Sequence, residues 1–273
     1  MNSSCAPHND EPVRRVQPLL GTFVEIGLWS NRMSRSALLE ISRHAFARIR
    51  VVQDRLSAHN RDSELGFLNR HPGQWIPLSQ DARRVLSLAR SMGRLSQDRF
   101  NCTVGGALVL RGALPDLGGP LSLPSGTWTD IDIDGNRARL LRPVRVTLDG
   151  IAKGYAVDCG IAELKRYGVD GGWINAGGDV RHFGAQSLSV MVDSPRLRRG
   201  GLTLCNAAVA SSQIRYAPRE GHPATYVGEA KEQALLSVKS PFAWRADAMT
   251  KVLAAYPPEQ RSAVAAAFNS EYL

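Results

Sequence analysis

The sequence is poor in paired cysteines and in long apolar runs, and each absence excludes a class of protein. Four cysteines are scattered along 273 residues without a Cys-x-x-Cys pair, which argues against a disulfide framework and a structural zinc site. No stretch approaches the roughly 18 consecutive apolar residues of a transmembrane helix. The first residues contain no apolar segment of the kind that a secretory signal has. We therefore expect a cytoplasmic protein without a membrane span.

Lysine is also scarce, with five residues against 29 arginines, and the net charge is +9. A positive balance of this size attracts phosphate-bearing partners in general. The densest basic runs, residues 48–55 and 196–199, are short, and no nucleic-acid-binding motif accompanies them. The charge therefore predicts an anionic ligand without naming it, and we expect no nucleic-acid partner.

The sequence does contain strand and helix patterns, but they do not alternate regularly. Because strand groups are interrupted by helices without a β-α-β repeat, we predict an α+β fold rather than a doubly wound sheet. We expect a polar, disordered tail over residues 1–16 and a single domain over residues 17–273. Apolar spacings of three and four predict helices over residues 34–56, 79–97, 152–167, 245–255 and 257–269. Partly alternating, β-branched segments predict strands over residues 20–29, 128–134, 138–142, 144–148, 172–175, 188–192, 202–206 and 234–239.

Residues 147–158, TLDGIAKGYAVD, carry the most chemical information. A strand ends at Asp149 and Gly150, and a helix begins two or three residues later. The first turn of a helix has free backbone N–H groups that, together with the helix dipole, favour an anion. Lys153 lies on the same helical stripe as three apolar residues. A lysine at the top of a buried stripe either binds an anion or extends to water, and both interpretations stay open for this segment alone.

Two further segments offer polar groups to a ligand. WINAGGDV leads a strand into Gly178 and Asp179, where backbone can approach a ligand, although an ordinary tight turn has the same pattern. In RADAMTK, Asp247 and Thr250 lie one helical turn apart and offer two hard oxygens of the kind that Mg²⁺ binds. The alternatives are a helix cap at Asp247 and a Thr250 hydroxyl that bonds back to a carbonyl.

Taken in order, these segments resemble the ApbE-like family of FAD:protein FMN transferases. The resemblance implies an α+β fold with mixed or antiparallel sheets, of the T-fold type. It implies a Mg²⁺-dependent enzyme that passes FMN from FAD to a Thr or Ser hydroxyl of an acceptor flavoprotein and releases AMP. The matching stretches are LLGTFVEIGL, RLSAHNRDSELGFLN, FNCTVGGAL, LDGIAKGYAVD, GGWINAGGDVRHFG, AAVASSQIRY and ADAMTKVL, over about residues 19–255.

The resemblance also implies roles for single residues. Lys153 would contact the diphosphate of FAD. The carbonyl of Gly150, the carboxylate of Asp247 and the hydroxyl of Thr250 would hold Mg²⁺. The other residues expected to contact FAD are Leu20, His59, Arg111, Gly112, Ala113, Thr147 and Gly178.

The chain departs from the family pattern at two places that matter for chemistry. The family's metal-binding Thr usually stands four residues after its Asp, whereas this chain has Lys251 there and Thr250 one residue earlier. The family's His-x-x-Asp-Pro-x-Thr-Gly stretch is replaced by APREGHPATYVGEAKEQ, in which His222 is the only histidine. Asp179 and His222 are the candidates for a general base.

Two other functions use the same residues. A hydrolase would let water attack FAD and would release FMN and AMP. An FAD-binding protein without catalysis is the second alternative, and the replaced stretch favours it.

Overall fold

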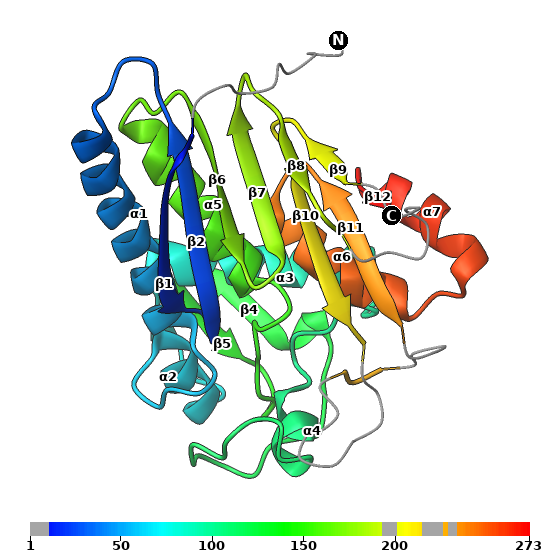
Figure 1. The fold of residues 1–273 in the computed structure, drawn as a ribbon. Coiled ribbons are helices and arrows are strands. Elements are labelled where there is room, and N and C mark those ends of the chain that lie inside the picture. Colours follow the sequence, from blue (N-terminus) through cyan, green and yellow to red (C-terminus); the bar gives the residue numbers. More distant parts are fainter. Residues whose placement is uncertain (1–10, 193–200, 215–225, 229–233) are drawn as a thin grey trace.

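The computed structural model describes residues 11–192, 201–214, 226–228 and 234–273. Within these residues, seven strands form one sheet in the order β1-β2-β6-β7-β10-β11-β12 (Figure 1). Each neighbouring pair in this sheet is antiparallel. The strands are β1 (Val13–Leu19), β2 (Thr22–Trp29), β6 (Gly171–Ala176), β7 (Asp179–Gly184), β10 (Ala208–Gln213), β11 (Leu235–Ser240) and β12 (Glu271–Tyr272).

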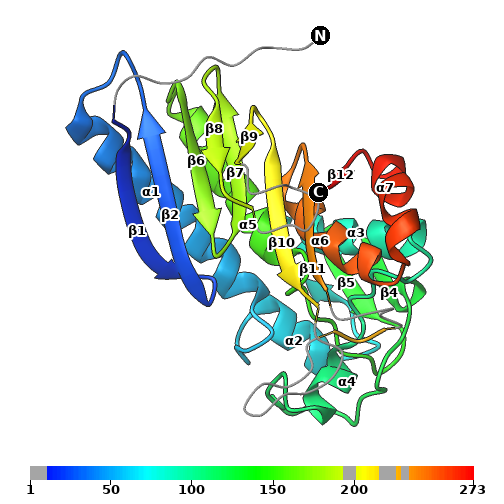
Figure 2. The same cartoon turned by 45° about the vertical axis from the view of Figure 1, so that its right-hand side comes forward.

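Helices cover one face of this sheet, as the two views in Figures 1 and 2 show. Helix α1 (Arg35–Leu56) contacts α5 (Ala152–Arg166), which in turn contacts α6 (Ala243–Ala254). The apolar stripe of α1 is buried as its spacing predicts, and it packs with β2 and β6 in the main hydrophobic core. Helix α7 (Pro258–Ala267) follows α6 and contacts β12.

The opposite face carries a smaller hydrophobic cluster around Trp29, Trp173 and Val209. Strands β8 (Leu188–Val190) and β9 (Leu202–Leu204) pair with each other and add Leu204 to that cluster. Both faces of the central strands are therefore partly covered. This explains why nearly all residues of β6 are buried, instead of buried and exposed residues alternating.

The remaining elements lie at the lower end of the large sheet in Figure 1 and behind it. A three-stranded sheet has the order β3-β5-β4, and a two-residue turn at Gly135 and Asn136 joins β4 to β5. The elements are α2 (Glu64–Arg70), β3 (Ile76–Pro77), α3 (Gln80–Leu95), α4 (Gly105–Leu110), a 3-10 turn η1 (Trp128–Asp130), β4 (Ile131–Asp134) and β5 (Arg137–Leu140).

The structure confirms the α+β fold with antiparallel sheets and corrects three details of the prediction. Strand β1 begins at Val13, so residues 13–16 are part of the sheet and not of a polar tail. This strand lies at the sheet edge, where the exposed Arg14 and the half-buried Arg15 replace the apolar alternation that identifies a strand. The segment expected as a strand over residues 144–148 makes only one isolated bridge, between Arg145 and Val104, and residues 128–130 form a 3-10 turn.

Among the helices that the structure describes, none combines the length and the apolar character that a membrane-spanning segment needs.

Candidate functional site

Turns between strands bring several of the motifs found in the sequence to one end of the large sheet, which is called this edge below. The β1-β2 turn at Leu20 and Gly21 and the β6-β7 turn at Gly177 and Gly178 lie at this edge, because β2 and β6 are paired antiparallel. Strand β10 runs past the start of β7 and ends at the same edge. Helix α5 begins close to these turns, so residues far apart in the sequence share one small volume.

Lys153 and Asp179 form the first charged pair of this edge. The Lys153 Nζ lies 2.8 Å from Oδ2 of Asp179, whose side chain is completely buried. Burial raises the pKa of Asp179, and the nearby carboxylate of Asp247 raises it further, against the opposite effects of Lys153 and Lys251. Burial alone would lower the pKa of Lys153, but Asp179 and Asp247 outweigh it and the pKa is raised. The pair therefore keeps a protonated lysine at the start of α5.

A second charged pair lies on one face of α6. The Lys251 Nζ is 2.5 Å from Oδ1 of Asp247 and 2.9 Å from Oγ of Ser212, at the end of β10. The Thr250 hydroxyl donates to the Asp247 carbonyl and to Ser212. Asp247 and Thr250 are almost fully buried, whereas about a quarter of the Lys251 side chain, 26%, is exposed.

These contacts decide whether the predicted metal ligands fit a divalent ion. Carboxylate, hydroxyl and carbonyl oxygens are suitable ligands for Mg²⁺. However, the ammonium of Lys251 already binds the Asp247 carboxylate, and Gly150 packs closely enough against Lys251 that a Cβ there would lie 3.4 Å from Cε. No group of three or more His, Cys, Asp and Glu side chains among the described residues could hold a metal ion. In this arrangement the predicted ligands do not fit Mg²⁺.

Two cavities open beside these pairs, and they meet at His59 and Asp149. The first has a volume of about 440 Å³ and the second about 550 Å³. The His59 Nε2 and the Asp149 Oδ2 lie 4.0 Å apart, and both residues line both cavities. The two volumes therefore form one continuous surface on either side of the segment that leads into α5.

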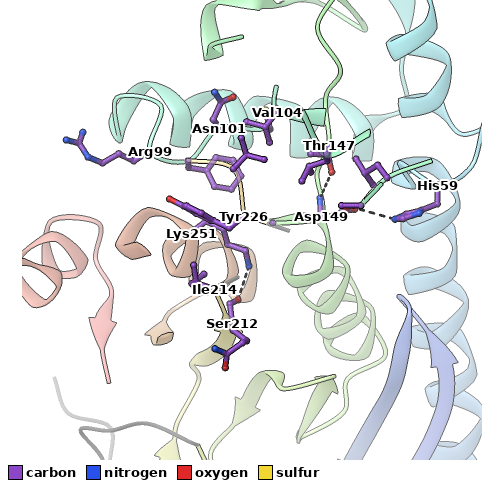
Figure 3. Close-up of a pocket in the computed structure, with 18 residues that line it drawn as sticks. His59, Arg99, Asn101, Val104, Thr147, Asp149, Ser212, Ile214, Tyr226 and Lys251 are labelled. Atoms are coloured by element: carbon purple, nitrogen blue, oxygen red, sulfur yellow. Dashed lines mark hydrogen bonds and ion pairs between the residues drawn. The ribbon is translucent and has the colours of Figure 1, made fainter. Parts of the chain in front are cut away.

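The first cavity is lined by both polar and apolar side chains, and Figure 3 shows how they surround it. The polar lining residues include Thr147, Asp149, Ser212 and Lys251. The apolar ones are Phe100, Val104, Leu108, Leu114, Ile214 and Tyr226. A lining of this mixed kind suits a ligand that carries both a flat ring system and an anionic group.

The second cavity lies between the end of α1 and the start of α5, and Lys153 is its only described lining lysine. Leu20 lines it from the β1-β2 turn with a φ of 57°, in the left-handed region that leucine rarely adopts. The Leu20 backbone N–H donates to Oε1 of Gln53 on α1, which holds this turn against the helix.

Some of the residues predicted to contact FAD line these cavities, and others do not. Leu20, His59, Ala113, Thr147 and Lys153 line a cavity. The cavity linings do not include Arg111, Gly112 or Gly178, and the Arg111 guanidinium donates instead to the Tyr226 carbonyl. His222 lies outside the described residues.

Several cavity residues were missed at the sequence level. Ser212 had a signal in the run of small polar residues AVASSQ, and Lys251 had one in its spacing of four from Asp247. Gln53 and Tyr226 had none, because their positions depend on contacts between distant segments.

One carboxylate outside the cavities joins the three elements that carry the charged pairs. Asp158 on α5 accepts hydrogen bonds of 3.0 Å from the backbone N–H groups of Ala243 and Trp244, in the first turn of α6. It also forms an ion pair with Arg181 of β7. Gly154 allows the close approach, since a Cβ there would lie 2.3 Å from the Ala243 carbonyl oxygen. Asp158 therefore fixes α5, β7 and α6 relative to one another.

Solved structures share this architecture. The crystal structure of the ApbE protein from Thermotoga maritima has a TM-score of 0.80 and 21% sequence identity, and the match covers 95% of this chain and 93% of that one. The apo form of the flavinyl transferase ApbE from Pseudomonas stutzeri has a TM-score of 0.76 at 21% identity, covering 94% of this chain and 88% of that one. At this identity the likeness shows the fold.

Sequence relatives agree with the structural ones. A protein of Haemophilus influenzae named FAD:protein FMN transferase is 27% identical over 153 residues, which are 50% of this chain and 44% of the relative. A protein of the same name from Vibrio cholerae is 26% identical over 146 residues, 48% of this chain and 42% of the relative. The chain thus matches less than half the length of these curated relatives. The profile of the ApbE family matches residues 20–273, and the chain belongs to the ApbE family.

Proposed function

We propose that the chain is an FAD:protein FMN transferase, which moves FMN from FAD to a Thr or Ser hydroxyl of an acceptor flavoprotein and releases AMP. The observation that carries the proposal is the pair of cavities that meet beside the start of α5, with one lysine facing each cavity. The names of the curated relatives support the same activity.

A flavin dinucleotide has two ring systems joined by a diphosphate, and the two cavities match that shape. Their junction at His59 and Asp149 lies next to the first turn of α5, where backbone N–H groups and the helix dipole favour a phosphate. Lys153 faces the second cavity and Lys251 the first. We infer that the diphosphate crosses the junction between these two ammonium groups and that each cavity holds one ring system.

In the proposed reaction, the acceptor hydroxyl oxygen attacks the phosphorus on the FMN side of FAD. A new bond forms between this oxygen and phosphorus, the bond from that phosphorus to the AMP phosphate breaks, and AMP leaves with the electron pair. Charge that develops on the diphosphate oxygens is neutralised by Lys153 and Lys251, which are already in place and need little rearrangement. No step is assigned to a divalent cation.

The hydroxyl must also lose its proton, and two residues were predicted for that task. Asp179 is fully buried and lines neither cavity, so we propose that it positions Lys153 instead of contacting the substrate. We propose His222 as the general base, because an imidazole with an ordinary pKa near 6.5 suits proton transfer at neutral pH. This role rests on the sequence alone.

Incubation of the purified chain with FAD and a candidate acceptor flavoprotein tests the function. Flavin fluorescence that stays on the acceptor in a denaturing gel, with AMP in the supernatant, is the expected result. Free FMN together with AMP would instead identify the hydrolase, and intact FAD bound to the chain would identify the binding protein.

Replacement of His222 tests the general base. His222→Gln should reduce the transfer rate by at least about a hundredfold, since general-base catalysis typically contributes 10² to 10⁴. FAD affinity, measured by fluorescence titration, should not change. A loss of less than about threefold would remove His222 from the chemistry.

A further inference from the structure

Lys251 occupies the position around which the oxygens of α6 and β10 converge. Its ammonium group bonds Oδ1 of Asp247 at 2.5 Å, the Asp247 carbonyl at 3.3 Å and Oγ of Ser212 at 2.9 Å. The bonds to the Asp247 carboxylate and to Ser212 are short, whereas the contact with the Asp247 carbonyl is long, so the ammonium group is held by two acceptors and still faces the cavity with its exposed side. Figure 3 shows the Lys251 side chain with its bond to Ser212 in the lining of the first cavity.

The same lysine separates the buried oxygens from the ligand cavity. Neither Asp247 nor Thr250 lines the first or the second cavity, whereas Lys251 lines the first. A divalent cation that reached the Asp247 carboxylate from the cavity would have to displace Lys251 from it. Mg²⁺ also requires near-octahedral oxygen geometry, and it would lie beside an ammonium group that repels it.

The sequence shows how this arrangement arises. Residues four apart on a helix lie on the same face, so the side chain four positions after Asp247 is directed toward its carboxylate. In this chain that side chain is a lysine, and the hydroxyl of Thr250 is turned to the Asp247 carbonyl and Ser212 instead.

We propose that Lys251 is the built-in cation of this site: its ammonium group takes the place of a divalent metal and neutralises the FAD diphosphate from the first cavity. The chain then binds FAD without Mg²⁺. The further statement that turnover needs no Mg²⁺ rests on the proposed transferase function.

Metal binding itself gives the first test, with Mn²⁺ alone as the probe and no flavin present. Titration followed by electron paramagnetic resonance should show no saturable Mn²⁺ site in the parent chain. Lys251→Thr removes the ammonium group and adds a hydroxyl, and it should bind Mn²⁺ at least about tenfold more tightly than the parent. Lys239→Thr is the matched control, because Lys239 pairs with Glu271 on a different part of the sheet and should leave Mn²⁺ binding unchanged.

The parent chain alone can overturn the proposal, so the result does not depend on whether the variant folds. Saturable binding of one Mn²⁺ by the parent would show that the lysine does not hold the cation position.

Flavin binding gives the second test. FAD affinity of the parent, measured by fluorescence quenching, should be the same in excess EDTA and in Mg²⁺. Lys251→Thr should bind FAD at least about tenfold more weakly in EDTA and should recover affinity when Mg²⁺ is added. An FAD affinity of the parent that collapses in EDTA would contradict the proposal.

The transfer assay separates this inference from the proposed function. Transfer that persists in EDTA supports both. Transfer that occurs only with Mg²⁺ would overturn the role of Lys251 and leave the transferase function standing. Absence of transfer in every condition would overturn the function, while the Mn²⁺ and FAD titrations would still decide the role of Lys251.

Discussion

Two buried carboxylates of this molecule, Asp81 and Asp179, have opposite surroundings. Asp81, at the start of α3, is 4% exposed and accepts hydrogen bonds from Arg48, Arg55 and Tyr155. Burial alone would raise its pKa, but these donors and the charge of Arg48 keep the pKa below its ordinary value. Asp81 therefore stays ionised and joins α1, α3 and α5.

Asp179 is fully buried but has far fewer donors. Its partner is the single ammonium group of Lys153, and neither carboxylate oxygen accepts a well-directed hydrogen bond from the described residues. A second carboxylate, Asp247, lies close enough to raise its pKa. The Asp81 carboxylate is satisfied by its own cluster, whereas the two buried oxygens of Asp179 share the single ammonium group of Lys153. Incomplete satisfaction of this kind is typical of functional sites.

The largest effect that this comparison predicts is on stability, at Asp81. Asp81→Ala removes the carboxylate that Arg48 and Arg55 share, although Arg55 keeps an ion pair with Glu64. Loss of one partner of a buried ion pair costs about 3–5 kcal/mol. Because Arg48 and Arg55 reach solvent in part, we expect the lower end, a loss of about 3 kcal/mol in the free energy of unfolding in urea. Glu40→Gln, which breaks an exposed ion pair with Arg43, is the control and should change nothing measurable. A loss at Asp81 as small as that control would contradict the structural role.

The next effect is on ligand binding, at Lys153. Lys153→Ala should weaken FAD binding by roughly 1.5–3 kcal/mol, the contribution of a hydrogen bond to a charged group. Lys165→Ala is the matched control, since Lys165 lies on the same helix and lines neither of the two cavities. Equal FAD affinities for the two folded variants in a fluorescence titration would show that the diphosphate does not use Lys153.

The smallest predicted effect is a pH-dependent gain in stability on replacement of Asp179, opposite in sign to the loss expected at Asp81. A carboxyl whose pKa is raised on folding costs stability once the pH exceeds its unfolded value near 3.8, because the folded state then holds the ionised form unfavourably. Asp179→Asn should therefore be more stable than the parent at pH 8, by about 1 kcal/mol, and show no gain at pH 3.5. The readout is the free energy of unfolding in urea at both pH values. A variant that is less stable than the parent at pH 8 would show that the ion pair of Asp179 stabilises the fold, as the ion pairs of Asp81 do.

Local patterns in the sequence predicted the parts of the site that local geometry determines. The buried stripe below Lys153 and the shared face of Asp247 and Thr250 follow from helical periodicity, so both could be placed before the structure. The pairing of Lys153 with Asp179 could not, because it depends on how the β6-β7 turn lies against α5. The edge strand β1 was not predicted, since Arg14 and Arg15 interrupt the apolar alternation of an ordinary strand.

Asp158 has a consequence for the order in which the molecule assembles. Its partners lie 23 residues away on β7 and 85 residues away at the start of α6. The contact with the start of α6 closes a large loop of the chain. The conformational entropy of this loop must be lost before the contact can stabilise the fold. Lys153 and Asp179 can meet once the segment from α5 to β7 has folded, but Asp247 and Lys251 join them only when α6 docks on Asp158. During synthesis, α6 is made after every strand of the large sheet except β12. A chain released before α6 therefore contains the first charged pair without the second, so the proposed dinucleotide site is assembled in two stages rather than one.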